Sequence, residues 1–305
     1  MPDRTSAMVA PVTAPSTAGL GGDSGCADGL PRRKGTLIFL HIPKTAGTTF
    51  NRILEAEYNP FRIHTLSPQN ILGDIERFKR LSESRKRWLD VLKGHMQFGL
   101  HEYLPNPAAY ITFLRDPVDR AVSAFFFIRE HRLHPMHREI KDRSIEDFIR
   151  ATPSQQNVQT KLIGGLTPDD ECTLEVLQRA QHNLRNSFSV IGITERFGES
   201  LAAMRRKFGW KLKRYRNYRV TSVRPASKEL PGPIVESIRR SNAYDVELYE
   251  LALRLFEQQL SSSELPENAA EIEDSFASPR SAGGRLIESA ETLGRAAITR
   301  LASAF

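Results

Sequence analysis

The chain has 305 residues, of which 43 are lysine or arginine and 36 are aspartate or glutamate, giving a formal net charge of +7 at pH 7. Its 40% hydrophobic and 26% charged residues are ordinary for a soluble globular protein. No segment approaches the roughly 18 uncharged apolar residues of a membrane span. Two cysteines are too few for a disulfide framework.

The N-terminal segment, residues 1–34, is rich in Gly, Ala, Pro, Ser and Thr without periodicity, and we expect it to be a disordered leader. It lacks the apolar region of a secretory signal. Cys26 lies in this leader and Cys172 lies far from it, a spacing that fits no metal site. These features predict a cytoplasmic protein.

The first predicted element is a strand at Thr36–Ile42, whose continuous apolar run is typical of a parallel strand covered on both faces. The chain then turns through Pro43 and Gly47 before a helix predicted at Thr48–Glu57. Such a turn directs backbone N–H groups and a helix N-terminus at one spot, which favours an anion, and Lys44 adds a full charge. It is not a Walker A motif, because its lysine precedes the glycine. The alternative is a plain strand-to-helix turn with a chance lysine.

Helices and strands continue to alternate after this turn. The pattern predicts a polar helix at Gln69–Arg87, a short strand at Val91–His95, a helix at Phe98–Leu104 and a buried strand at Ala109–Leu114.

A second motif follows the last of these strands. Arg115 lies at the strand end, and Asp116 is a suitable N-cap for a helix predicted at Pro117–His131. Ser123 lies two turns along this helix, with Arg120 on the same face. A guanidinium at a strand end and an inward serine suit a phosphate group. The alternative is a capped helix with Arg115 in a structural ion pair.

Further predicted elements are a strand at Phe188–Thr194 and helices at Ser144–Ala151, Pro168–Leu184, Phe197–Phe208 and Asn242–Gln259. Because strands alternate with helices, the sequence predicts an α/β fold of three layers, with a mainly parallel central sheet flanked by helices. We expect this domain to occupy residues 35–263.

Charge is distributed unevenly near the C-terminus. Arg205–Arg219 contains eight lysines and arginines and no acid, which suits an anionic cofactor or polymer; the alternative is a solvated surface. Residues 264–305 hold seven acids and four bases, and we expect an acidic flexible tail. An amphipathic helix predicted at Arg285–Phe305 suits peripheral contact with a partner or a membrane surface.

The two motifs, HIPKTAGTTF at His41–Phe50 and TFLRDPVDRAVSAFFF at Thr112–Phe127, together resemble the PAPS-dependent sulfotransferases. The nearest group contains the heparan sulfate and uronyl 2-O-sulfotransferases and their bacterial relatives. Further similar segments are Gly94–Leu100, Asn157–Gly165 and Ile191–Phe197. The resemblance implies a P-loop-like form of the three-layer fold. It also implies transfer of a sulfonate group from 3′-phosphoadenosine 5′-phosphosulfate (PAPS) to a hydroxyl, most simply of a carbohydrate or glycoconjugate.

The resemblance assigns each motif to one end of PAPS. The residues assigned to the 5′-phosphosulfate are Lys44, Thr45, Ala46, Gly47, Thr48 and Thr49, and those assigned to the 3′-phosphate are Arg115 and Ser123. Lys44 would also offset the charge that develops on the leaving phosphate. As in phosphoryl transfer, positioning and charge stabilisation dominate, and a lysine in this role requires no metal.

His95 is the predicted general base, because it lies at a strand end and imidazole titrates near the working pH. In the resembling 2-O-sulfotransferases a histidine of such a Gly-His segment is the base, although they have His-Gly-His where this chain has Lys93, Gly94 and His95. The alternative is a structural role for His95, with His101 as the second candidate. His41, on the preceding strand, is expected to be packed.

Asn157, Gln159 and Lys161 offer amide and cationic groups that suit sugar hydroxyls or carboxylates, and the alternative is that they shape a loop. Two other functions stay open. A nucleotide-dependent kinase-like enzyme needs Mg²⁺ ligands and a Walker lysine, neither of which is found in the sequence. A non-catalytic binder of anionic polymer would use Lys211–Arg219, whose interleaved tyrosines suit stacking on nucleic-acid bases. Such a binder does not need two separated phosphate motifs, which disfavours nucleic acid as a partner.

Overall fold

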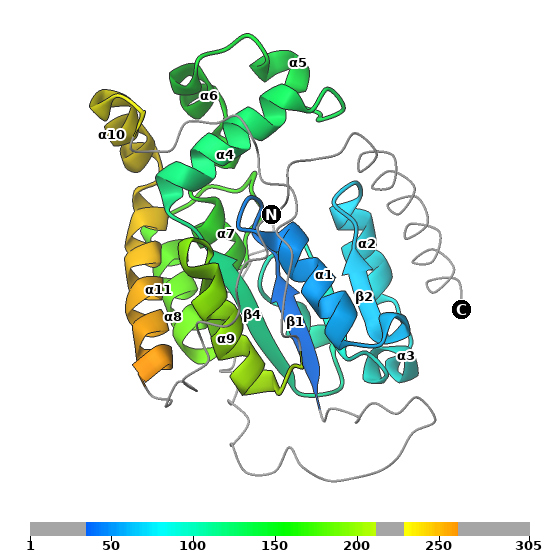
Figure 1. The fold of residues 1–305 in the computed structure, drawn as a ribbon. Helices are drawn as coiled ribbons and strands as arrows, with labels where there is room; N and C mark the ends of the chain where they lie inside the picture. The colour runs from blue at the N-terminus through cyan, green and yellow to red at the C-terminus, as the bar shows by residue number, and fades with distance from the viewer. Residues whose placement is uncertain (1–34, 212–228, 262–305) are drawn as a thin grey trace, which may run out of the picture.

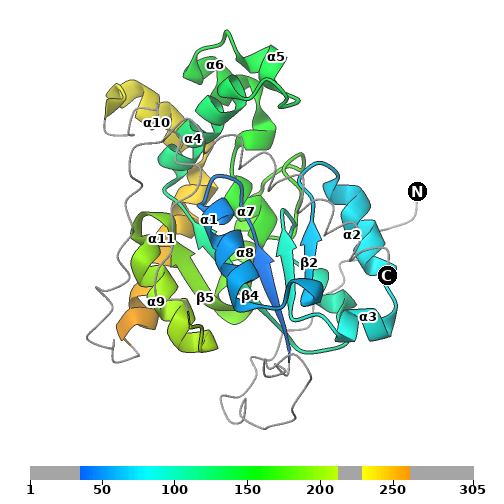
Figure 2. The same ribbon diagram turned by 45° about the vertical axis from the view of Figure 1, so that its right-hand side comes forward.

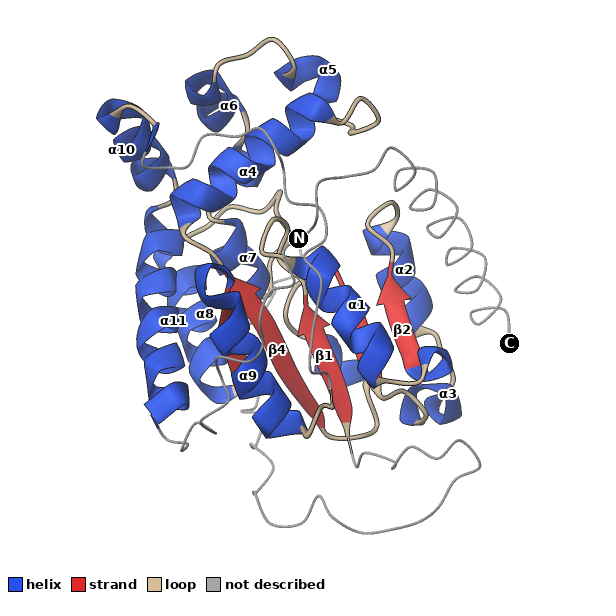
Figure 3. Cartoon of the chain, in the orientation of Figure 1, coloured by secondary structure: helices blue, strands red, loops and turns tan. Residues whose placement is uncertain are grey.

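The structure is a computed structural model that describes residues 35–211 and 229–261 (Figure 1). A parallel sheet of five strands lies at its centre, flanked by helices (Figure 3). The predicted α/β fold with a parallel central sheet is therefore confirmed. The leader at 1–34, the tail at 264–305 and all but the first residue of Lys211–Arg219 lie outside the described residues.

The strands are arranged in the order β2-β3-β1-β4-β5, and every neighbouring pair is parallel. Their bounds are β1 Thr36–Leu40, β2 Ile63–Leu66, β3 Val91–Gly94, β4 Ala108–Leu114 and β5 Phe188–Ile193. The chain leaves β1 for the edge strand β2, returns to β3 and then passes β1 to reach β4. The order of strands thus reverses around β1. In open parallel sheets ligands bind at the carboxyl ends of the strands, at such a reversal.

Helices cover both faces of the sheet and its carboxyl edge. Figure 3 shows α1 and α9 in front of the sheet, with α7 and α8 behind it. Figures 1 and 2 show α4, α5, α6 and α10 beyond the carboxyl ends of the strands. The bounds are α1 Gly47–Glu57, α2 Ile71–Lys79, α3 Glu83–Arg87, α4 Pro117–Glu130, α5 His137–Ile140, α6 Ile145–Ala151, α7 Val158–Ile163, α8 Leu174–Asn186, α9 Phe197–Phe208, α10 Gly232–Ser241 and α11 Ala243–Ser261. None of the helices within these described ranges is long and apolar enough to cross a bilayer.

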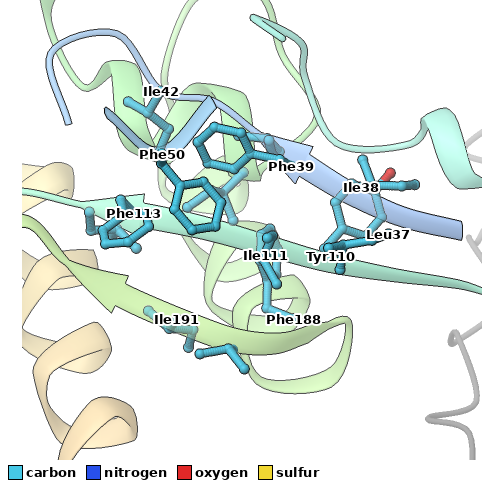
Figure 4. Packing of buried hydrophobic residues seen from close by; sticks show 14 of the residues in the cluster. Leu37, Ile38, Phe39, Ile42, Phe50, Tyr110, Ile111, Phe113, Phe188 and Ile191 are labelled. Carbon is cyan, nitrogen blue, oxygen red and sulfur yellow. The ribbon is translucent and has the colours of Figure 1, made fainter. Parts of the chain in front are cut away.

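Two separate apolar clusters hold the molecule together. The larger one surrounds the sheet, and Figure 4 shows Phe39, Phe50 and Phe113 packed within it. The ring of Phe50 makes edge contacts with the other two, at centroid distances of 4.7 and 4.9 Å, so that the first turn of α1 is fixed between β1 and β4. The smaller cluster joins α4, α5, α6 and α10, with Phe125 and Phe148 among its members. It forms a helical cap beyond the carboxyl edge.

Some predicted helices have different bounds. The helix predicted at Gln69–Arg87 is interrupted, because the Ser82 side chain accepts a hydrogen bond from the first turn of α3 and starts a new helix. The helix predicted from Pro168 begins at Leu174, where Thr173 is the N-cap. The structure also contains β2, α5, α7 and α10, which the sequence pattern did not predict.

Candidate active site

The turn after β1 has a left-handed backbone at two non-glycine residues. Lys44 has φ of 74° and Ala46 has φ of 60°. Such conformations cost on the order of 1–3 kcal/mol each and cluster at functional sites, where the surrounding structure holds them in place. Left-handed residues in a turn also gather backbone N–H groups into a concave anion site.

The start of α1 completes this turn. The N-cap residue of α1 is Ala46, whose methyl side chain makes no capping hydrogen bond. The first-turn N–H groups and the positive end of the helix dipole are therefore suited to an anion. Thr48 is partly exposed, whereas Thr49 is buried. Thr45 is fully buried and its hydroxyl donates to the carbonyl of Ile42 at 2.8 Å, so this side chain supports the turn itself.

Gly47 leaves space for a histidine ring. A Cβ atom at this position would lie 1.7 Å from Nε2 of His41. His41 is 9% exposed, as expected for a packed residue, and its ring stacks on Phe39 at a centroid distance of 5.3 Å. The first residue of α1 therefore has to lack a side chain if His41 is to stay in this position.

Lys44 extends from the turn toward the helical cap. Its Nζ atom lies 3.9 Å from the centroid of the Phe127 ring, on α4. A cation–π contact of this kind contributes about 0.5–2 kcal/mol, which is small enough for a bound anion to displace. The contact places the last turns of α4 directly beside the turn after β1, which we call the phosphate turn.

Arg115 connects the two sequence motifs. It follows β4, and the Gln159 side chain binds both its backbone N–H and its carbonyl, each at 2.9 Å. The guanidinium Nη1 donates to the carbonyl of Lys44 at 3.0 Å. Its Nε lies 3.7 Å from Glu195 Oε1. The second motif thus contacts the left-handed turn of the first.

The start of α4 is as predicted. Asp116 caps the helix by accepting hydrogen bonds from two first-turn N–H groups, at 2.9 and 3.0 Å. Ser123 is 3% exposed and lies on the buried face of α4. Arg120 on that face is fully buried, donates to the carbonyl of Gln155 at 2.5 Å and pairs with Asp245 at 3.9 Å. It belongs to a buried network that joins α4 to α11.

His95 follows β3 at the carboxyl edge. Gly94, with φ of 143°, allows the chain to turn there, and a Cβ atom at Gly94 would lie 2.5 Å from the Leu66 carbonyl oxygen. The ring centroid of His95 lies 4.3 Å from that of His41. Burial lowers the pKa of His95 to about 4, so the imidazole is neutral at pH 7.

Lys93 stands where the resembling enzymes have a first histidine. Its side chain is 2% exposed, and its Nζ lies 2.7 Å from Glu55 Oε1 of α1. Burial lowers the pKa of Lys93, while Glu55 raises it. The lysine is thus engaged in a structural ion pair between β3 and α1.

His101, the second candidate for the base, does not share the carboxyl edge. The helix predicted at Phe98–Leu104 is a 3-10 turn at Leu100–Tyr103, and His101 is half-buried. Its Nδ1 lies 3.1 Å from the Tyr110 hydroxyl. The backbone of Tyr110 precedes the end of β4 by four residues, which is about 13 Å along a strand. The geometry therefore favours His95 as the base.

Asn157, Gln159 and Lys161 use their polar groups inside the protein. Gln159 holds the backbone after β4, and the Asn157 side chain bonds to the start of α11. The Lys161 ammonium donates to the carbonyls of Pro153 and Pro168, at 3.1 and 2.8 Å. These contacts favour the structural alternative over substrate contact.

Two further observations bear on what the site could bind. A cavity of about 380 Å³ lies between the first turn of α4 and α10, lined by Asp116, Val118, Leu230, Gly232, Val235, Glu236 and Arg239. Within residues 35–211 and 229–261, no group of three or more His, Cys, Asp or Glu side chains is arranged to hold a metal ion.

A parallel α/β fold with a left-handed, lysine-bearing turn after its central strand forms a site that suits an anionic ligand at the carboxyl edge of the sheet. Residues 5–273 match the galactose-3-O-sulfotransferase family model, and the chain belongs to this family. The predicted resemblance to sulfotransferases is thus confirmed.

The chain is also similar to individual proteins that are sulfotransferases by name. The chain is 29% identical over 250 residues to galactose-3-O-sulfotransferase 3 of Bos taurus. The aligned region covers 73% of this chain and 57% of the cattle protein. It is 26% identical over 253 residues to heparan sulfate 2-O-sulfotransferase 1 of Xenopus laevis, with coverage of 72% and 70%. A crystal structure of a mouse sulfotransferase complexed with PAP superposes with a TM-score of 0.38 and 14% identity, covering 83% and 74% of the two chains. The chain spans little more than half the length of the cattle relative.

Proposed function

We propose that this chain is an enzyme that transfers a sulfonate group from PAPS to a hydroxyl of a carbohydrate or glycoconjugate. One observation carries the proposal beyond family membership. Lys44, Arg115 and His95 follow three adjacent strands, β1, β4 and β3, and therefore meet at the carboxyl edge. A phosphate turn, a guanidinium and a neutral imidazole are the groups that this transfer requires.

The turn and the end of β4 would bind the two ends of the donor. The left-handed turn, the start of α1 and the Lys44 ammonium suit the 5′-phosphosulfate. Arg115, with Ser123 on the buried face of α4, suits the 3′-phosphate. The turn residues Thr45, Ala46, Gly47, Thr48 and Thr49 would contribute backbone donors or packing.

The reaction is an in-line substitution at sulfur. The acceptor oxygen forms a bond to sulfur while the bond between sulfur and the 5′-phosphate oxygen breaks, and its electron pair stays on the phosphate. The hydroxyl proton goes to the neutral ring of His95. Lys44 and the backbone donors stabilise the charge on the leaving phosphate, a contribution of about 10²- to 10³-fold for one such donor.

The end of α4 offers a surface for the acceptor. The Phe127 ring that contacts Lys44 also packs on the His131 ring, at a centroid distance of 4.0 Å. Arg132 and Arg138 follow, are exposed, and form no ion pair within the part of the chain that the structure describes. Exposed cations on the segment that follows α4 suit an acceptor with acidic groups, such as uronate or sulfate.

Incubation with labelled PAPS and a panel of acidic and neutral glycans tests the function. We expect labelled glycan with the wild-type chain and a loss of label with Lys44→Ala. Filter binding of PAP, ATP and RNA separates the alternatives. Tight binding of RNA without sulfonate transfer indicates the polymer binder, and phosphate transfer from ATP indicates the kinase-like enzyme.

Three expectations from the sequence stay predictions. These are the cytoplasmic location, the peripheral contact through residues 285–305, and a reaction that needs no metal. Activity that survives treatment with a chelator is the expected result for the last of them, because Lys44 takes the role that a metal ion has in phosphoryl transfer.

A further inference from the structure

Glu195 is a carboxylate at the carboxyl edge to which no role has been assigned so far. It lies in a 3-10 turn at Thr194–Arg196, directly after β5, and β5 is the neighbour of β4. Three groups converge on its two oxygens. Oε1 accepts the backbone N–H of Asp116 at 3.2 Å and lies 3.7 Å from Nε of Arg115. Oε2 accepts the Tyr249 hydroxyl of α11 at 3.0 Å.

These contacts place Glu195 behind the guanidinium of Arg115. Nη1 of that guanidinium donates to the carbonyl of Lys44, whose φ of 74° is one of the two left-handed conformations in the phosphate turn. The Arg115 side chain is 11% exposed and that of Glu195 is 34% exposed, so the pair is partly shielded from water. A continuous series of contacts thus runs from α11 through Glu195 and Arg115 to the turn after β1.

We propose that Glu195, supported by Tyr249, is a positioning residue of the nucleotide site. It holds the Arg115 guanidinium against the Lys44 carbonyl, and thereby fixes the 3′-phosphate group and the 5′-phosphosulfate turn relative to each other. This inference rests on the proposed function. Glu195 acts through Arg115 in this proposal, because the contacts of its oxygens are with Arg115, Asp116 and Tyr249.

Calorimetric titration with PAP, the product of the proposed reaction, tests this role without requiring turnover. Glu195→Gln retains the size of the side chain and removes its charge. We expect PAP affinity to fall by about 3- to 30-fold, which lies within the range for residues coupled in one network. Tyr249→Phe removes one hydrogen bond to Glu195 and should weaken PAP binding by about 2- to 5-fold. Thermal unfolding of both variants should stay near that of the wild type.

A double-mutant cycle separates positioning from general damage to the fold. In an Arg115→Ala background, Glu195→Gln should change PAP affinity by less than about twofold, because the residue that it positions is gone. The matched control is Glu199→Gln. Glu199 pairs with Arg196 one turn further along, away from Arg115. We expect this variant to bind PAP as the wild type does.

The outcomes distinguish this role from the proposed function. A wild-type chain that does not bind PAP overturns both. A wild type that binds PAP, with unchanged affinity in Glu195→Gln and Tyr249→Phe, overturns the positioning role alone. Equal losses for Glu195→Gln in the presence and absence of Arg115 also overturn it, since they show that Glu195 does not act through the arginine. If Glu195→Gln does not fold, the same cycle with Tyr249→Phe decides.

Discussion

Lys44 is the side chain whose loss should affect turnover most directly. Its ammonium group contacts the Phe127 ring and belongs to a turn, not to the core. We expect Lys44→Ala to fold normally and to lose about 10²-fold or more in kcat, the usual effect of removing one donor to the developing charge. Initial rates with PAPS and urea unfolding measure the two effects. Turnover within a few-fold of wild type would exclude the assigned role.

The substitution Gly47→Ala should destabilise the protein, which is the opposite of what helix propensity predicts. In an ordinary helix, glycine to alanine stabilises by up to about 1 kcal/mol. Here the added Cβ would lie 1.7 Å from His41 Nε2, so the buried ring has to move away from Phe39 and His95. We expect Gly47→Ala to lower the urea midpoint and the rate.

A second substitution tests the cause of that loss. Trimming the clashing ring, in the variant Gly47→Ala with His41→Ala, should recover part of the stability lost in Gly47→Ala. A single variant Gly47→Ala that is as stable as the wild type would show that the ring is easily displaced and does not determine the residue at position 47.

His95 should act as a base in a pH range set by its burial. The neutral ring is the active form, and burial lowers its pKa from 6.5 to about 4. Turnover should therefore stay level from pH 8 to about 5 and fall only below that, rather than near 6.5. Bound PAPS is an anion and raises the pKa of a nearby imidazole. The acidic limb in the pH profile of kcat should therefore lie at a higher pH than the acidic limb in the profile of kcat/KM.

Substitution of His95 identifies the group that titrates. His95→Ala should lose most of the rate and the acidic limb, while PAP affinity changes little. Intact turnover with lost PAP affinity would place His95 in the nucleotide site instead. An acidic limb that persists unchanged in the variant would assign the titration to another group, with His41 the nearest imidazole.

At the scale of elements, the end of β4 and the helix α4 should contribute differently to nucleotide binding. Arg115 contacts the Lys44 carbonyl, whereas Ser123 lies two turns along α4. We expect Ser123→Ala to weaken binding of PAP but not of AMP, which lacks the 3′-phosphate. Arg115→Ala should weaken both, by about tenfold or more for PAP, because it also loosens the turn. Calorimetry with the two ligands measures this. A loss confined to PAP in Arg115→Ala would show that the turn holds its shape without the arginine.

Elements with a strong local signal were predicted, and elements stabilised from a distance were not. The apolar runs of β1, β4 and β5 are fully recognisable, because both faces of each strand are covered. The four residues of β2 are Ile, His, Thr and Leu, and only pairing with β3 makes them a strand. Helix α7 follows Asn157 with φ of 50° and buries Gln159 and Lys161, so its polar sequence does not resemble a buried helix.

The residues of the candidate site also fall into those that a local sequence pattern predicts and those that only tertiary packing brings together. Lys44 and Arg115 follow predicted strands and His95 ends one, and parallel pairing alone is enough to bring strand ends together. Phe127 has the same apolar character as its neighbours in the sequence, and only the course of α4 brings it to Lys44. Glu195 and Tyr249 meet across 54 positions of sequence. Contacts of that separation follow from tertiary packing, which no local pattern contains.

At the scale of the whole molecule, the sheet and the helical cap have different structural roles. The main core holds the strand ends in place, and the smaller cluster builds α4, α5, α6 and α10 as a separate layer beyond them. Because α4 starts at the end of β4 and runs beside the turn after β1, one helix joins the nucleotide side of the site to the proposed acceptor surface. Arg120 and Asp245, both fully buried, anchor that helix to α11.

The folded molecule should lose stability in mild acid, because it buries neutral histidines. Burial lowers the pKa of His64 and His95 to about 4 and that of His41 well below its usual value. The unfolded chain then binds more protons than the folded one between about pH 6.5 and 4. Stability from these groups is complete above pH 6.5 and is lost as the pH falls toward 4. Asp245 and Glu195, whose pKa values burial raises, act in the opposite direction.

His64 isolates this effect, since it lies on the edge strand β2, which carries none of the proposed site residues. Urea unfolding of the wild type and of His64→Gln should be compared at pH 7 and pH 5. The loss of unfolding free energy between the two pH values should be smaller in the variant by about 1–2 kcal/mol, because a pKa of about 4 in the folded state is compared with 6.5 in the unfolded state. An equal loss in both proteins would mean that His64 gains its proton without unfolding, and that the strand edge admits water.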